Sequence, residues 1–80
     1  MTKYQELLLK ILNDEYEGNQ TLMAKRLQKH SPNKIINHDL VRNNIYKPQK
    51  EVSPLLAKLI ELDSKGKYKR TDLNPVTVLV

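Results

Sequence analysis

The sequence predicts a mainly helical fold, in which four helices form one small domain and a short apolar tail or β-strand follows. Three observations support this prediction. Apolar residues recur at helical spacing in four segments, N-cap residues precede these segments, and glycine or proline separates them. The chain has 80 residues, near the lower end of what one core stabilises. We therefore expect one domain over residues 1–75 and an apolar tail over residues 76–80.

The first helix is expected over residues 2–17. Thr2 and Gln5 have the spacing of a capping box, in which each side chain bonds the backbone of the other residue. Gly18 suits the left-handed backbone conformation that ends many helices. This helix is interpreted as scaffold, because its apolar residues form one helical stripe: Tyr4, Leu8, Ile11, Leu12 and Tyr16.

The second helix is expected after Asn19, a favourable N-cap. It begins with Gln20, places the small residue Ala24 four positions later, and adds the apolar Leu27 three positions after that. Met23 contributes a second buried position on the same stripe. A small residue at this point allows a second helix to cross closely, so this segment is expected to support another helix.

The third helix follows a connection that contains the helix breaker Pro32, and Asn37 is placed to cap it. In the connection, at least one of Ile35 and Ile36 is expected to be buried. The expected inner face of the helix comprises Leu40, Val41, Ile45 and, at the end, Tyr46. The other face comprises His38, Asp39, Arg42 and Asn43. Arginine can bond the edge of guanine and asparagine that of adenine, so this face is a candidate for contacting DNA bases.

The fourth helix is expected to begin at Ser53, an N-cap followed by proline, and to end near Gly66. Its apolar stripe comprises Leu55, Leu56, Leu59 and Ile60, with Leu62 at its margin. The basic run over 65–70 is either solvated or in contact with phosphate. Residues 71–75 are expected to form a turn that places Leu73 on the core. The apolar segment 76–80 is a strand exchanged between two copies, an edge strand, or a disordered tail.

The composition limits the function classes. A net charge of +5 and a pI near 9.6 indicate an anionic partner, nucleic acid before a membrane surface. The chain has no cysteine, no glycine-rich phosphate loop and no histidine pair at ligand spacing, so we expect no enzyme, metal, cofactor or small-molecule ligand. No apolar run reaches membrane-spanning length and no signal peptide is visible, so a cytoplasmic protein is expected.

Residues 20–75 resemble the Cro-like helix-turn-helix proteins of phages and prophages, a group that includes small antitoxin-like regulators related to Cro. The resemblance is carried by Gln20, Ala24, Leu27, Val41, Ile45, the basic loop 47–50, the Ser53-Pro54 helix start and the Asp72-Leu73-Asn74-Pro75 tail. The chain departs from the family pattern at Gln28, where relatives have glycine. Its connection over residues 29–36 is also longer than in relatives.

The resemblance implies a sequence-specific double-stranded DNA-binding repressor that acts as a homodimer on a palindromic operator. Two third helices would then enter successive major grooves about 34 Å apart. Base contacts are expected from Asn37, His38, Asp39, Arg42 and Asn43, where Asp39 either accepts from cytosine or orients Arg42. Phosphate contacts are expected from Gln20, Lys25, Lys29, Lys47 and Lys50.

Two alternatives stay open. A small phage-encoded inhibitor or antitoxin could hold an acidic partner protein with its basic face. The long connection after Leu27 and the acidic Asp39 on the supposed DNA-facing surface favour this alternative. An RNA-binding module is less well supported, since the chain has no aromatic pairs spaced for base stacking.

Overall fold

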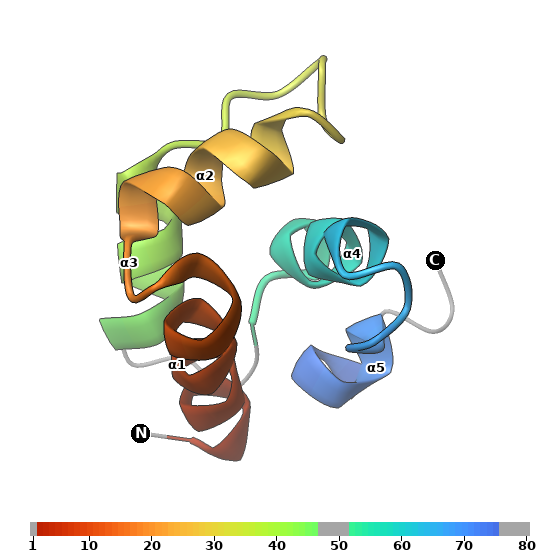
Figure 1. The fold of residues 1–80 in the computed structure, drawn as a ribbon. Helices are drawn as coiled ribbons and strands as arrows, with labels where there is room; N and C mark the ends of the chain where they lie inside the picture. The colour runs from red at the N-terminus through yellow and green to blue at the C-terminus, as the bar shows by residue number, and fades with distance from the viewer. Residues whose placement is uncertain (1, 47–51, 76–80) are drawn as a thin grey trace.

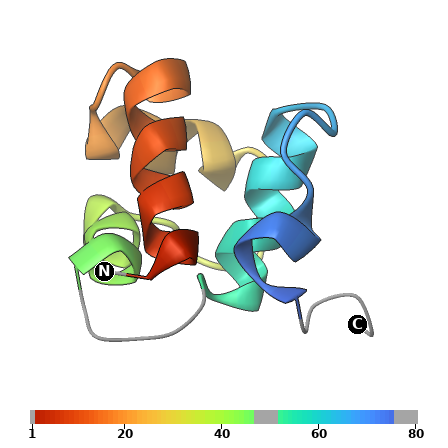
Figure 2. The same cartoon turned by 90° about the horizontal axis from the view of Figure 1, so that it is seen from below.

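The computed structural model describes residues 2–46 and 52–75, which form five α-helices and no strand. The helices are α1 (Lys3–Tyr16), α2 (Gln20–Gln28), α3 (His38–Tyr46), α4 (Pro54–Asp63) and α5 (Arg70–Leu73). α1 stands between α3 on one side and the α4–α5 pair on the other (Figures 1 and 2). α2 contacts α1, α3 and α4, so it links α3 on one side of α1 to α4 on the other side. The prediction of a mainly helical fold is confirmed.

The ends of α1 follow from local chemistry. The Gln5 backbone N–H donates to Thr2 Oγ1 at 3.2 Å and the Thr2 N–H donates to Gln5 Oε1 at 3.0 Å, so the predicted capping box is present. At the other end both Glu17 and Gly18 have positive φ, and the Gly18 N–H donates to the Leu12 carbonyl at 2.9 Å. Four residues of the predicted apolar stripe are buried, namely Leu8, Ile11, Leu12 and Tyr16, whereas Tyr4 is half-buried.

α4 begins and ends close to the predicted residues. Ser53 Oγ accepts from the Leu56 backbone N–H at 3.3 Å, which caps the helix next to its initial proline. Gly66 has a φ of +85° and its N–H donates to the Glu61 carbonyl at 2.9 Å, which closes the C-terminal end. Leu62 remains 43% exposed, as its marginal position on the stripe suggested.

The segment 71–75 differs from the prediction, because residues Arg70–Leu73 form the one-turn helix α5 instead of a simple turn. The Asn74 backbone N–H donates to the Arg70 carbonyl at 2.8 Å, which closes the helical turn. The Asn74 side chain donates to the Val52 carbonyl at 2.8 Å, and Val52 N–H donates to the Leu73 carbonyl at 3.2 Å. These bonds fix the segment in the position where Leu73 is fully buried, as predicted. The described residues therefore form five helices, one more than the sequence predicted.

The inner face of α3 also differs from the prediction at its end. Tyr46, expected on the inner face, is 59% exposed, whereas the polar Asn44 is buried. Asn44 donates to the Leu40 carbonyl at 2.9 Å and accepts from the Ser53 N–H at 2.8 Å. A polar side chain tolerates burial when both halves of its amide are bonded. Asn44 therefore fixes the end of α3 against the start of α4.

Several predictions fall outside the described residues. They include the basic loop with Lys47 and Lys50, and the apolar segment 76–80. Among the described helices, none combines the length and the apolar character that crossing a bilayer requires.

Candidate nucleic-acid interface

α2 is held in place by its cap and its buried stripe. Asn19 Oδ1 accepts from the Leu22 backbone N–H at 3.0 Å, as its position before the helix predicted. The three predicted inner residues Met23, Ala24 and Leu27 are buried, and α2 packs directly against α3 (Figure 1). The small Ala24 side chain, only 3% exposed, thus lies within the packed interior of the domain.

The connection between α2 and α3 is organised by the side chain of Gln28. Its Nε2 donates to the carbonyls of Ser31 at 2.6 Å and Lys34 at 2.8 Å, and its Oε1 accepts from the Ile36 N–H at 2.7 Å. Ile36 is then buried, whereas Ile35 is 85% exposed. Sequence reasoning treated Gln28 only as a departure from glycine. The signal that was missed is a glutamine directly before a long connection, since one primary amide can bond several backbone groups of such a connection.

Replacement of Gln28 by alanine is expected to destabilise the domain by about 2 kcal/mol, because three backbone groups lose their partner and water replaces it only in part. Chemical denaturation would measure the loss, and hydrogen exchange at the Ile36 amide should become faster. Lys29→Ala changes the adjacent exposed residue and serves as the control. Unchanged exchange at Ile36 in Gln28→Ala would contradict the assigned role.

Asn37 caps α3, since its Oδ1 accepts from the Leu40 backbone N–H at 3.0 Å. The cap uses the carbonyl oxygen of the amide. Asn37 is exposed, and its NH₂ group is the part of the side chain that remains suited to a base edge. Capping and base contact are therefore compatible at this residue.

The outer face of α3 brings together three of the predicted base-contacting side chains. Arg42 Nη2 donates to Asp39 Oδ1 at 3.0 Å, and His38 Nε2 lies 3.3 Å from the same oxygen. Each of these side chains is more than half exposed. Asn43 is half-buried at the edge of this face. The interpretation that Asp39 orients Arg42 agrees with this geometry.

The predicted phosphate contacts that the structure describes lie on α2 or at its C-cap. Gln20 is half-buried at the first position of the helix, whereas Lys25 and the C-cap residue Lys29 are exposed. The start of a helix exposes backbone N–H groups, which are the donors that phosphate accepts. These three residues come from α2 and its C-cap, whereas the linked side chains come from α3. Lys47 and Lys50 lie outside the described residues.

Arg26 of α2 belongs to a cluster around Asp63, called here the Asp63 cluster, while its side chain remains 44% exposed. Its guanidinium lies 4.9 Å from the centre of the Tyr16 ring and 3.5 Å from Asp63 Oδ2. The Tyr16 hydroxyl donates to Asp63 Oδ2 at 2.5 Å, and His30 Nε2 lies 3.1 Å from Oδ1. The cluster therefore joins α1, α2 and the end of α4.

The electrostatics of the Asp63 cluster follow from its contacts. Burial alone would raise the pKa of the Asp63 carboxyl, but hydrogen bonds from Tyr16 and His30 and the charge of Arg26 together hold it below its ordinary value. Burial and the adjacent carboxylate raise the pKa of the Tyr16 hydroxyl well above its usual range. Both groups are thus stabilised in the forms that keep their mutual hydrogen bond.

The basic run over residues 65–70 is partly used inside the domain. Lys67 Nζ lies 2.6 Å from Glu15 Oε1, and Arg70 Nε donates to Glu61 Oε1 at 2.7 Å. The bond from Lys67 lowers the pKa of Glu15, and the bond from Arg70 lowers that of Glu61. These two cations therefore connect parts of the fold, although Lys67 is exposed like the other lysines of the run.

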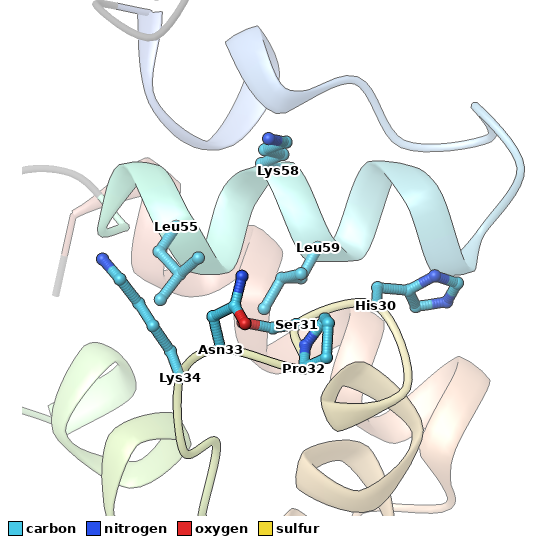
Figure 3. Close-up of a pocket in the computed structure, with 8 residues that line it drawn as sticks. All are labelled: His30, Ser31, Pro32, Asn33, Lys34, Leu55, Lys58 and Leu59. Carbon is cyan, nitrogen blue, oxygen red and sulfur yellow. The ribbon is translucent and has the colours of Figure 1, made fainter.

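A pocket lies between α4 and the connection that follows α2, with a volume of about 310 Å³ (Figure 3). Leu55 and Leu59 point from α4 towards the connection and form its apolar wall. The exposed Lys34 and Lys58 give the lining positive charge. The lining residues are His30, Ser31, Pro32, Asn33, Lys34, Leu55, Lys58 and Leu59. Within residues 2–46 and 52–75, no three histidine, aspartate or glutamate side chains gather in a metal-binding arrangement.

Comparison of the chain with protein-family models, with curated proteins and with solved structures gives no match.

Proposed function

We propose that the chain is a sequence-specific double-stranded DNA-binding repressor of Cro type. In this proposal α2 and α3 are the two helices of a helix-turn-helix, and α3 lies in the major groove. One observation carries the proposal. α3 buries Val41 and Ile45 beside α2, while its opposite face exposes Asp39 and Arg42 as a bonded pair. An arginine presented in this way on the first turns of a helix can bond a guanine edge.

The positive charge supports the same function. The net charge of +5 favours approach to a polyanion, and the exposed Lys25 and Lys29 are placed on the helix that crosses the DNA backbone in such proteins. Gln20 at the start of α2 would bond a phosphate, and Lys47 and Lys50 would add contacts from the following loop. These contacts contribute affinity and salt dependence, whereas sequence preference comes from α3.

The proposed active form is a homodimer in the cytoplasm, bound to a palindromic operator. Its two copies of α3 would enter successive major grooves about 34 Å apart. Repression would follow because the bound dimer blocks access of RNA polymerase. The segment 76–80 is proposed as a dimerisation strand, because an apolar strand gains from pairing with another edge.

The test is selection of bound duplexes from a random DNA library at physiological salt, followed by sequencing of the enriched pool. A palindromic motif with half-sites one helical turn apart is the expected result. Binding that depends only on duplex length, without enrichment of any sequence, would overturn the proposal.

Arg42→Ala is expected to cost roughly 1–3 kcal/mol of affinity for the selected duplex and to relax preference at one base position, because the bidentate contact is lost. Titration of the selected duplex and its single-base variants would measure both effects. Lys10→Ala, an exposed change on α1, is the control. Equal binding of Arg42→Ala and wild type to every duplex would show that Arg42 does not contact bases.

The pocket in Figure 3 favours a second candidate function, an inhibitor or antitoxin that holds an acidic partner protein. Lys34 and Lys58 beside Leu55 and Leu59 suit a segment that combines carboxylates with an apolar side chain. Lys58→Glu separates the two functions, because Lys58 is not among the proposed DNA contacts. Partner binding lost in Lys58→Glu and retained in Arg42→Ala would support the second function.

A further inference from the structure

The carboxylate of Asp39 is the unusual feature of the exposed face of α3. A negative charge on a surface that meets DNA repels phosphate, so its presence there requires a compensating role. The structure shows that its Oδ1 atom is bonded by Arg42 Nη2 at 3.0 Å and lies 3.3 Å from His38 Nε2. One carboxylate oxygen is thus shared by both cation-forming side chains of α3.

We propose that Asp39 determines specificity by reserving Arg42 for a base edge and keeping it away from phosphates. The inference deepens the proposed DNA-binding function and rests on it. Asp39 would act through Arg42 without itself contacting DNA, which makes it a positioning residue.

The geometry of the guanidinium makes this role possible. Arginine carries five N–H donors, and the bond to Asp39 occupies one of those on Nη2. The second Nη2 proton and those of Nη1 remain available for two parallel bonds to the O6 and N7 atoms of guanine. Arg42 can therefore contact guanine while its bond to Asp39 remains.

A phosphate contact is penalised by the same arrangement. Arg42 would have to leave Asp39, or the Asp39 carboxylate would have to approach the negative phosphate with it. Guanine carries no formal charge, so the carboxylate opposes base contact less than phosphate contact. The pair thus weakens nonspecific binding more than specific binding, which raises the ratio of the two affinities.

Asp39→Asn tests the inference through the salt dependence of binding. Freed from the carboxylate, Arg42 should neutralise one additional phosphate in a random duplex. The slope of log K against log salt should then become steeper by about 0.9, and random-duplex affinity should rise about fivefold at 0.15 M salt. Affinity for the selected duplex should rise less, so the specificity ratio should fall.

Three further variants isolate the effect. Asp14→Asn removes one negative charge, as Asp39→Asn does, but at an exposed position of α1. It should leave the slope unchanged. The double variant Asp39→Asn, Arg42→Ala should lose the additional slope, because the effect operates through Arg42. Asp39→Ala should reproduce the effect without a new amide that could bond DNA itself. Circular dichroism and chemical denaturation would establish that each variant is folded.

Provided that the wild-type protein prefers its selected duplex, two results would overturn the inference. One is an unchanged specificity ratio in both Asp39 variants. The other is the same slope change in Asp14→Asn as in Asp39→Asn, which would show a general charge effect. A wild-type protein without any sequence preference would instead overturn the proposed function, on which the inference depends.

Discussion

Ala24→Glu is expected to unfold the domain. Ala24 is 3% exposed on α2, so a glutamate at this position would place a carboxylate without a partner in the interior. Burial of an unpaired charge costs several kcal/mol, and the added volume strains the packing further. A chain of this length has a total stability of about 4–12 kcal/mol, so the folded state would be largely lost. Far-UV circular dichroism and thermal denaturation would measure the effect.

The neighbouring Lys25→Glu variant is the matched control for Ala24→Glu. It introduces the same side chain one position later, where the residue is exposed. This control should retain the helical spectrum and a cooperative transition. If Ala24→Glu also unfolds cooperatively near the wild-type temperature, the placement of Ala24 in the interior is wrong.

Asp63→Ala is expected to destabilise the domain by about 2–3 kcal/mol at neutral pH. Tyr16 is 2% exposed, and its hydroxyl would lose the carboxylate that accepts its hydrogen bond. Arg26 and His30 would lose the same partner, so α1, α2 and α4 would no longer be joined at this point. Urea denaturation would give the difference in free energy of unfolding.

The pH dependence of this difference identifies its cause. Because folding lowers the pKa of Asp63, the carboxylate stabilises the folded state above the unfolded-state pKa of about 3.9. This contribution is lost as the pH falls through the lower folded-state pKa. The difference between wild type and Asp63→Ala should therefore shrink in acid. A difference that is the same at pH 7 and in strong acid would contradict a role for the ionised carboxylate.

Sequence reasoning succeeded where the deciding contact is local. The caps formed by Thr2, Asn19 and Ser53 each depend on a bond three residues along the chain. The exposed face of α3 could also be predicted locally, because the helical repeat alone places Val41 and Arg42 on different faces of the helix. These features need no knowledge of the remaining fold.

Two of the features that sequence reasoning missed depend on contacts between distant residues. α5 is fixed by the bond from Asn74 to Val52, which are 22 positions apart. Arg26 pairs with Asp63, which lies on another helix and comes within 3.5 Å. No local pattern predicts such pairs, since many lysines and arginines of this chain would fit an exposed helical face equally well.

Arginine and lysine differ in this chain in how they are paired with carboxylates. The chain has three arginines, and each lies beside a carboxylate: Arg26 beside Asp63, Arg42 beside Asp39 and Arg70 beside Glu61. The excess positive charge is therefore supplied by lysines, of which Lys67 has a carboxylate partner. Acylation, which neutralises lysine and leaves arginine intact, would thus remove the attraction for anions while sparing the arginine links. Lysine methylation would preserve both, because it retains the charge.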